Sequence, residues 1–544
     1  MQLVSRCRIF PRCAMLPVWL FALPLLLPFP VQANNTGETP QAIINILRTQ
    51  LTSPESITAE PPLDWSRLKA FYEARGFYPA WVDRFGPLPR AEVLKQALIT
   101  ADEEGLNAKD YYPEKIASLW HSRTPTQLTQ LELLLSDAFF RYSVHLRAGH
   151  HKENNFNWDI EPPEIEPVDE LRYLLTVNSF AAALKDLTPA HIGYLRLREA
   201  LKRYRQIRKQ GGWPMMPAGP VLKKGSWHKQ VEVLRQRLLA EGDLELGPTR
   251  DVRYFDDAVE FALERFQVRH GIRMDGVLGP VTRKMMNVTV TQRIKQIKYN
   301  MERWRWLPRW LTKRYIMVNT AGFNLDVVED EDIQFSMGVI IGTPERPTPV
   351  VASRLHTVVF NPYWTVPPTI VFEDLLPRQR RNPAFFKANH IRVIRNGEEV
   401  DPTEVNWNKV NKNYFPFILR QDPGPKNSLG RIKFLFKNDY TVYLHDTPKK
   451  YLFDKDSRAF SSGCIRVEDP ARLASYLLGD DNGWTVEKIR ETIDSGKYLE
   501  VPILNTMPIY LVYMTAWVEE NGAAHFRPDI YQWDPKVSKC DVIR

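Results

Sequence analysis

Cysteine is scarce in this chain. Only four cysteines occur among 544 residues, and two of them, Cys7 and Cys13, lie in the first 33 residues. The other two thiols, Cys464 and Cys540, cannot form the disulfide framework that stabilises small secreted domains. A Cys464–Cys540 bridge is one alternative, but we favour a free Cys464 because chains tend to fray near the carboxyl end.

Long apolar runs are also missing after residue 33, which excludes a further typical membrane-spanning helix. The first 33 residues carry Arg6, Arg8 and Arg12, then the run MLPVWLFALPLLLPFP, then Val31-Gln32-Ala33. A basic start, a short apolar core and a small-residue exit are typical of a secretory signal peptide. We expect cleavage near Ala33, with an uncleaved anchor as the alternative.

Acidic residues are outnumbered: the formal net charge is +9, and about +6 without the three arginines of residues 1–33. This modest basicity suits an anionic partner such as a cell wall or a membrane surface. No clustered basic stripe or binding motif accompanies it, so we expect no nucleic-acid partner. The length exceeds what one hydrophobic core supports and predicts three or more domains.

Helical periodicity dominates residues 34–215. The segments LDWSRLKAFYEARG, RAEVLKQALITADEEG, TQLELLLSDAFFRYSVHLRAG and YLRLREALKRYRQIRKQGG repeat apolar residues at i, i+3, i+4 and i+7. These patterns predict an α-helical scaffold. His150 and His151 are candidate metal ligands, but no Cys or acid cluster with ligand spacing accompanies them. We expect an exposed loop pair, and neither a metal nor another cofactor.

Residues 226–290 follow the Gly-Pro-rich joint GGWPMMPAGP. VEVLRQRLLAEGDL and AVEFALERFQVRHG predict two helices, and DGVLGPVTRKMMN predicts a turn that feeds a third. In that turn Gly276 and Gly279 supply backbone freedom, while Pro280 and Thr282 suit a helix start. The order resembles the small three-helix peptidoglycan-binding module of cell-wall enzymes, with a generic three-helix unit as the alternative.

Residues 313–540 change to short β-rich runs such as RYIMVNT, FSMGVIIG, HTVVFNPYWTV, RIKFLF and TVYLH, separated by Pro, Gly and Asn turns. They predict a mostly β domain, so the whole chain is a multi-domain α+β protein. Residues from about 375 to 425 interrupt the strands, and we expect this long insertion to be a lid or a substrate-shaping loop. Two helices and a closing pair of strands, in MPIYLVYMTAW and HFRPDIYQWD, complete the domain.

Cys464 lies in the segment AFSSGCIRVEDP. A nucleophilic cysteine needs a base or cation nearby and partial exposure. His445 ends a predicted strand nineteen residues upstream, and two adjacent strands would bring the pair together. Gly463 lets the backbone approach a substrate, and the turn amides suit an oxyanion. Arg466 would share a strand face with Cys464, and a surface ion pair with Glu468 or Asp469 is its alternative.

The segment HDTPKKYLFDKDSRAFSSGCIRVED resembles the catalytic signature of the L,D-transpeptidases, which have the YkuD-type fold. That signature is His, a gap, Ser or Thr, His, Gly, Cys, an aliphatic residue, and Arg or Asn. The matching positions are His445, Ser461, Gly463, Cys464, Ile465 and Arg466. Ser462 replaces the second His, and Asp446 stands where Gly often follows the first. Both departures resemble the large Gram-negative subgroup that carries a helical scaffold, a peptidoglycan-binding module and a lid.

This resemblance implies a catalytic constellation of Cys464, His445, Arg466, Gly463 and Ser462. Cys464 would attack the third residue of a tetrapeptide donor, release the terminal D-alanine and form a thioester. The side-chain amine of a diamino acid in another stem would then give a 3-to-3 cross-link, whereas water would make the protein an L,D-carboxypeptidase. Carbapenems are expected to acylate the same thiol. The implied location is the periplasm, near the inner membrane surface, with other cell-wall synthesis enzymes as further partners.

Four further residues are candidates for the substrate cleft: Asn361, Trp364, Tyr443 and Ser461. Trp and Tyr give flat apolar walls with a polar tip, and core packing is the alternative for these positions. Two other protein classes remain open. One is a catalytically inactive wall-binding scaffold, and the other is a thiol–disulfide protein, which the lack of a Cys-x-x-Cys pair disfavours.

Overall fold

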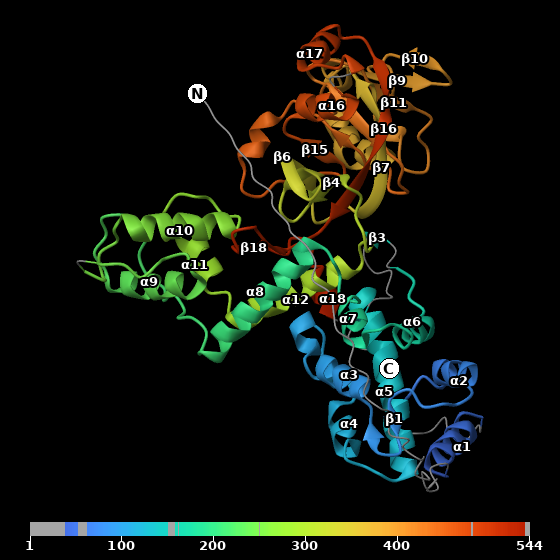
Figure 1. Cartoon of the computed structure of the whole chain (residues 1–544). Helices are drawn as coiled ribbons and strands as arrows, with labels where there is room; N and C mark the ends of the chain where they lie inside the picture. Colours follow the sequence, from blue (N-terminus) through green and yellow to red (C-terminus); the bar gives the residue numbers. More distant parts are fainter. Residues whose placement is uncertain are drawn as a thin grey trace, which may run out of the picture.

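The computed structural model describes residues 38–52, 62–150, 158–160, 163–249, 251–479 and 482–538. The expected signal peptide, His151 and Cys540 lie outside these ranges. A helical part, a three-helix module and a β domain surround two long helices, α8 (Ile192–Lys209) and α12 (Val290–Arg305) (Figure 1). In the described ranges, no helix has the length and apolarity needed to cross a membrane.

The N-terminal part is helical, which confirms the prediction from periodicity. Its helices are α1 (Glu38–Thr52), α2 (Trp65–Ala74), α3 (Pro89–Ile99), α4 (Pro113–Leu119), α5 (Pro125–Arg147), α6 (Pro167–Leu174) and α7 (Phe180–Lys185), with 3-10 turns η2 (Ala101–Glu104) and η3 (Ala108–Tyr111). Helix α5 is central, because Leu131, Leu135 and Phe139 are all buried along it. Its buried Glu132 accepts hydrogen bonds from the amides of Trp81 and Val82 at 2.8 and 3.0 Å. These bonds fix the hairpin of β1 (Val82–Asp83) and β2 (Gly86–Pro87) to the helix.

The second part has the three predicted helices, α9 (Lys229–Glu241), α10 (Asp257–Arg269) and α11 (Pro280–Met286), around a small core of its own. Gly276 has φ +62°, which requires the freedom of glycine. Gly279 is the N-cap of α11 with φ −90°, so the prediction that it needs the same freedom is wrong. Pro280 takes the first helical position, as expected.

Helices α8 and α12 join the parts. A capping box of Thr289 and Gln292 starts α12. Leu201 of α8 and Ile297 and Met301 of α12 belong to one buried core that continues into the β domain. The packed pair therefore forms the base on which the β domain rests.

The β domain is built on one sheet in the order β12-β13-β15-β6-β5-β4-β16-β7-β3, with β14 paired to β6. Strand β7 also pairs with β12, so the sheet closes on itself. The strands are β3 (Trp158–Asp159), β4 (Arg314–Asn319), β5 (Asn324–Glu329), β6 (Asp332–Gly342), β7 (Val350–Phe360), β12 (Ile432–Phe436), β13 (Leu444–His445), β14 (Ala459–Ser461), β15 (Ile465–Val467) and β16 (Leu499–Val512). Helices α16 (Pro470–Leu478) and α17 (Val486–Asp494) follow β15. Within this sheet β13 and β15 are parallel neighbours.

The chain end returns to the base. A hairpin of β17 (Ala516–Val518) and β18 (Ala524–Phe526) forms the expected closing pair, whereas the apolar run MPIYLV belongs to β16 instead. Helix α18 (Asp534–Ser538) follows, and Asp534 pairs with Arg303 of α12 at 2.6 Å. The end of the chain is thus tied to the connector helix.

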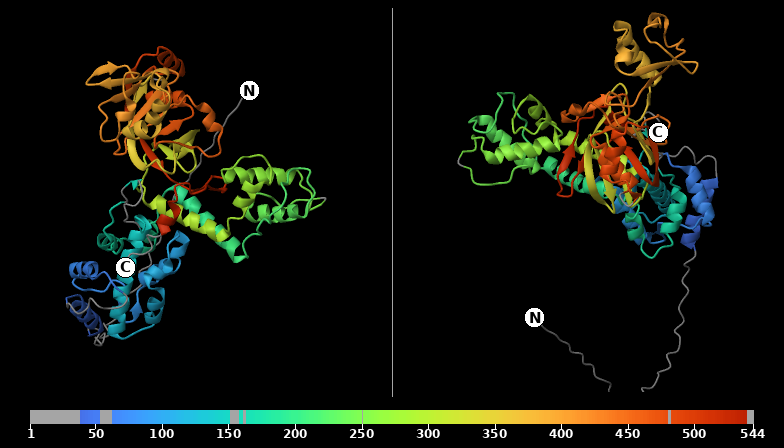
Figure 2. Two further views of the ribbon diagram at one scale, coloured as in Figure 1. Left: turned by 180° about the vertical axis from the view of Figure 1, so that it is seen from behind. Right: turned by 90° about the horizontal axis from the view of Figure 1, so that it is seen from above.

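The insertion is a folded unit with a sheet and a core, and the right-hand view of Figure 2 shows it projecting from the β domain. Its elements are β8 (Trp364–Thr365), α13 (Pro368–Ile370), η4 (Val371–Leu375), α14 (Leu376–Arg381), α15 (Phe385–Ala388), β9 (Ile391–Arg395), β10 (Glu398–Val400), η5 (Trp407–Lys409) and β11 (Ile418–Gln421). The sheet order is β10-β9-β11-β8. Strand β8 follows β7 of the closed sheet after only a few residues. The insertion is therefore attached to the strand that pairs with β12.

Candidate active site

Strand register gathers the candidate residues on one face. His445 of β13 lies opposite Arg466 of β15 on one side and opposite Lys433 of β12 on the other. One step earlier, the amide of Ile465 donates to the carbonyl of Tyr443 at 3.1 Å, which sets Tyr443 beside Cys464. Because side chains alternate along a strand, the other five residues share a face, and Ile465 points to the opposite one.

Cys464 lies in a tight turn held by Ser461. The Ser461 hydroxyl accepts from the Gly463 amide at 3.1 Å and donates to the Cys464 carbonyl at 2.5 Å. The Gly463 carbonyl accepts from Thr348 Oγ1 at 2.8 Å. Gly463 has φ +113°, a conformation that side chains rarely adopt. The turn therefore needs glycine for its backbone, and its geometry fixes the direction of the thiol.

Burial raises the pKa of the Cys464 thiol, and a hydrogen bond from the Tyr443 backbone and the charges of Lys433 and Arg466 oppose that rise. Cys464 is partly exposed. A raised pKa means that the thiol keeps its proton at neutral pH. The site therefore needs a base to make the nucleophile.

His445 has the protonation state that such a base requires. Burial and the nearby Arg466 charge lower the pKa of His445 to about 3, so the ring is neutral at pH 7. Its Nδ1 lies 2.5 Å from the carbonyl oxygen of Asp446. A carbonyl can only accept, so Nδ1 carries the hydrogen and Nε2 carries the lone pair.

Arg466 has no carboxylate partner among the described residues, and its Nε is buried without a hydrogen bond there. Glu468 instead accepts from the amide of Gly338 at 2.8 Å, and Asp469 caps α16. The surface ion pair considered as an alternative is therefore absent. A partly buried guanidinium without a carboxylate partner favours an anionic ligand, such as a substrate carboxylate.

Ser462 replaces the second histidine of the signature and contacts the insertion through Arg346. Arg346 Nη1 donates to Ser462 Oγ at 2.8 Å and pairs with Asp374 at 2.7 Å. Arg346 also pairs with Glu373 of the same turn, η4, at 2.7 Å. The catalytic turn and the base of the insertion are thus connected through one side chain.

The four candidate substrate contacts differ in their surroundings. Tyr443 interacts through its hydroxyl with Trp364 and with the Cys464 thiol. Trp364 belongs to the core of the insertion, against which Tyr443 packs. Asn361 is fully buried, with its amide bonded to the carbonyls of Thr492 and Lys497 and its oxygen to Arg431. The polar atoms of Asn361 and of the buried Ser461 are thus bonded within the protein, whereas Tyr443 interacts with the Cys464 thiol itself.

Sequence reasoning missed Lys433. Its Nζ lies 3.9 Å from the centre of the Tyr443 ring, and burial lowers its pKa. The alternation of RIKFLF marks Lys433 as an out-of-place charge between Ile432 and Phe434 in a buried strand. This alternation can be read from the sequence, but the pairing of β12 with β13, which sets Lys433 opposite His445, cannot.

Three family models match the chain. A "Scaffold domain" matches residues 66–201, a "Putative peptidoglycan binding domain" matches 228–286, and an "L,D-transpeptidase catalytic domain" matches 313–496. A curated protein of Haemophilus influenzae named "Putative L,D-transpeptidase" is 36% identical over 262 residues, which are 48% of this chain and 51% of the relative. The chain thus spans about half the length of the curated relative that it matches.

Solved structures of L,D-transpeptidases are also similar. One from Xylanimonas cellulosilytica has 14% identity and a TM-score of 0.17, and covers 54% of this chain and 99% of its own. One from Stackebrandtia nassauensis has 14% identity and a TM-score of 0.21, and covers 55% and 96%. At these TM-scores the two likenesses add nothing further. From the matched regions and the site, the chain carries a YkuD-type L,D-transpeptidase catalytic domain beside a peptidoglycan-binding domain and a scaffold domain.

Proposed function

We propose that this protein is a peptidoglycan L,D-transpeptidase that forms 3-to-3 cross-links through a thioester on Cys464. The observation that carries the proposal is the shared strand face of Cys464, His445 and Arg466, on which the imidazole is neutral and the thiol keeps its proton. An inactive wall-binding scaffold would have no need for this combination.

In the first half-reaction His445 Nε2 accepts the thiol proton as Cys464 Sγ attacks the carbonyl carbon of the third donor residue. The tetrahedral oxyanion lies near the amide of Cys464, which donates no hydrogen bond within the described chain. The carbon–nitrogen bond to the terminal D-alanine breaks, and imidazolium returns the proton to the leaving amine. The products are free D-alanine and a thioester.

In the second half-reaction the side-chain amine of a diamino acid in another stem attacks the thioester. His445 takes a proton from that amine, and the thiolate leaves and is reprotonated. One amide replaces another, so no energy-rich co-substrate is needed. Arg466 holds a donor carboxylate, and Tyr443 and Trp364 form walls of the acyl site.

This function requires export to the periplasm. Residues 1–33 act as the signal peptide that directs this export and is then cleaved off. The residues from about 375 to 425 act as a lid over the acyl site, and the module at 226–290 keeps the enzyme at the wall. Other cell-wall synthesis enzymes supply tetrapeptide stems, and carbapenems acylate Cys464 in place of the donor.

The test uses purified mature protein and defined tetrapeptide muropeptides, with products analysed by mass spectrometry. We expect cross-linked dimers and free D-alanine from the wild type, and neither from Cys464→Ala. Tripeptide and D-alanine without dimers would assign an L,D-carboxypeptidase instead. Equal dimer yields from both proteins would refute the role of Cys464. Meropenem supplies a second readout, because a scaffold would form no covalent adduct at this thiol.

A further inference from the structure

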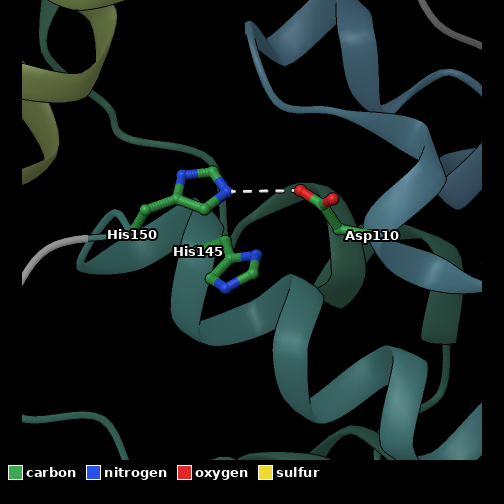
Figure 3. A group of neighbouring side chains, drawn as sticks. All are labelled: Asp110, His145 and His150. Carbon is green, nitrogen blue, oxygen red and sulfur yellow. Dashed lines mark ion pairs between the residues drawn. The ribbon is translucent and has the colours of Figure 1, made fainter. Parts of the chain in front are cut away.

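A second cluster of chemically active side chains lies away from Cys464, where the helical part meets α12. Asp110 comes from η3, His145 from the last turn of α5, and His150 from the segment that follows α5. Figure 3 shows both imidazoles beside the Asp110 carboxylate. The His150 side chain is only 12% exposed, so the prediction of an exposed loop is wrong at this residue.

The ion pair of Asp110 and His150 is longer than a hydrogen bond, and the three groups lie close enough to share an ion. His150 Nε2 lies 3.7 Å from Asp110 Oδ2, which exceeds hydrogen-bond length, and this nitrogen is buried without a hydrogen-bond partner in the described chain. One ligand atom from each of Asp110, His145 and His150 lies within 4.8 Å of the other two. Two ligands at about 2.0 to 2.2 Å from a tetrahedral zinc ion stand about 3.3 to 3.6 Å apart. Small side-chain rotations would therefore close a coordination shell.

The surroundings resemble those of a bound metal. His150 Nδ1 faces Glu302 Oε2 at 3.6 Å, and the backbone amide of His150 donates to Glu302 Oε1 at 2.6 Å. A metal-binding imidazole commonly turns its other nitrogen to a carboxylate in this way. His145 Nδ1 is similarly held by the Tyr111 hydroxyl at 3.0 Å.

Two carboxylates face the imidazoles. Arg305 pairs with Glu302 at 2.7 Å, whereas among the described residues the ion-pair partner of Asp110 is His150 itself. A pocket beside the cluster, lined by Asn107, His150 and Glu302, offers an access route. Lys295 and Lys298 also line that pocket, so the bonds from the three side chains to the ion must outweigh its repulsion by these two ammonium groups.

We propose that Asp110, His145 and His150 bind one divalent cation of the zinc class. Two imidazoles and one carboxylate favour Zn²⁺ over Mg²⁺ or Ca²⁺, which prefer oxygen ligands alone. Through Glu302 the ion fixes the helical part to α12, the helix that leads into the catalytic domain. Its role is to set the position of the scaffold, and the proposal is independent of the transpeptidase reaction.

The test titrates Zn²⁺ into full-length mature protein that carries no histidine tag and has been stripped with EDTA. Cys464→Ala and Cys540→Ala are present throughout, because free thiols bind zinc. We expect one zinc per chain by calorimetry, a visible absorption band with Co²⁺, and a zinc-dependent rise in the thermal midpoint. The absence of stoichiometric binding in this protein would by itself overturn the proposal.

Matched variants locate the ion. We expect His150→Gln and Asp110→Asn to weaken zinc at least about tenfold, and Glu302→Gln to weaken it about 10- to 100-fold as an outer partner. His121→Gln, on an exposed histidine of the same helical part, should leave the affinity unchanged. Wild-type affinity in both folded His150→Gln and Asp110→Asn proteins would contradict the assignment. If either variant fails to fold, the other decides.

Discussion

Lys433 lies directly opposite His445 across two paired strands, with its ammonium 3.9 Å from the centre of the Tyr443 ring. The hydroxyl of the same tyrosine interacts with the Cys464 thiol. A buried ammonium on this face stabilises the thiolate as it forms. Lys433 is therefore part of the proposed machinery, although it lies outside the Cys-containing signature.

We expect Lys433→Met to slow acylation of Cys464 by about tenfold, because one of two cations that face the thiol is lost. Stopped-flow fluorescence or timed mass spectrometry with a carbapenem measures that rate. Lys437→Met is the control, since Lys437 is exposed directly after β12, the strand that carries Lys433, and shows no such contact with the site. Equal rates in the two variants would remove Lys433 from the machinery.

The Cys464 thiol should lose its proton only at high pH. Because burial raises the pKa of Cys464, alkylation by iodoacetamide should accelerate with a midpoint above the ordinary pKa of a cysteine. Loss of either cation, in Lys433→Met or Arg466→Gln, should move the midpoint to still higher pH. A plateau already reached at neutral pH would instead indicate a preformed thiolate–imidazolium pair.

His445 should make the protein less stable in acid. Its folded pKa is about 3 and its ordinary value is 6.5, so between these values the unfolded chain binds the extra proton. The free energy of unfolding therefore falls as pH drops through this window, by about 1.4 kcal/mol per pH unit from this residue. Urea denaturation at pH 5 and pH 7 should show a smaller fall in His445→Gln. His121→Gln, at an exposed position, should keep the wild-type fall.

Arg346 should act on the reaction more than on stability. Its ion pairs with Glu373 and Asp374 are partly exposed and contribute little to folding, about 1 kcal/mol or less. Arg346→Ala frees Ser462 and the base of the insertion, so we expect a lower kcat/KM for the tetrapeptide donor with almost unchanged unfolding. Arg354→Ala, on an exposed arginine of β7, is the control. Wild-type kinetics in Arg346→Ala would exclude this connection.

The insertion should unfold on its own. Trp407 is buried in its core, with its ring 5.1 Å from that of Phe386. Trp407→Ala should destabilise this unit by about 3 to 5 kcal/mol. Hydrogen exchange should then accelerate in β9 and β11 while β7 and β16 keep their protection, and donor turnover should fall. Uniform loss of protection would show that the insertion and the barrel unfold together.

The sequence alone predicted the helical, three-helix and β parts, because their apolar periodicities are strong and each buries a core of its own. It also singled out Cys464 and Arg466, which follow the turn glycine Gly463, and His445, which ends a predicted strand and matches the first histidine of the signature. It could not place Lys433, because a strand's partner depends on how the sheet closes. His150 looked like a loop residue, and only the fold shows that the segment after α5 lies against Glu302 of α12 and Asp110 of η3.

Intact-protein mass spectrometry after brief exposure to a tetrapeptide donor tests the central claim most directly. The wild type should gain the mass of the donor minus D-alanine, with the adduct mapped to Cys464, and His445→Gln should gain it far more slowly. An unmodified wild-type protein that still releases D-alanine, or an adduct on another residue, would contradict the account.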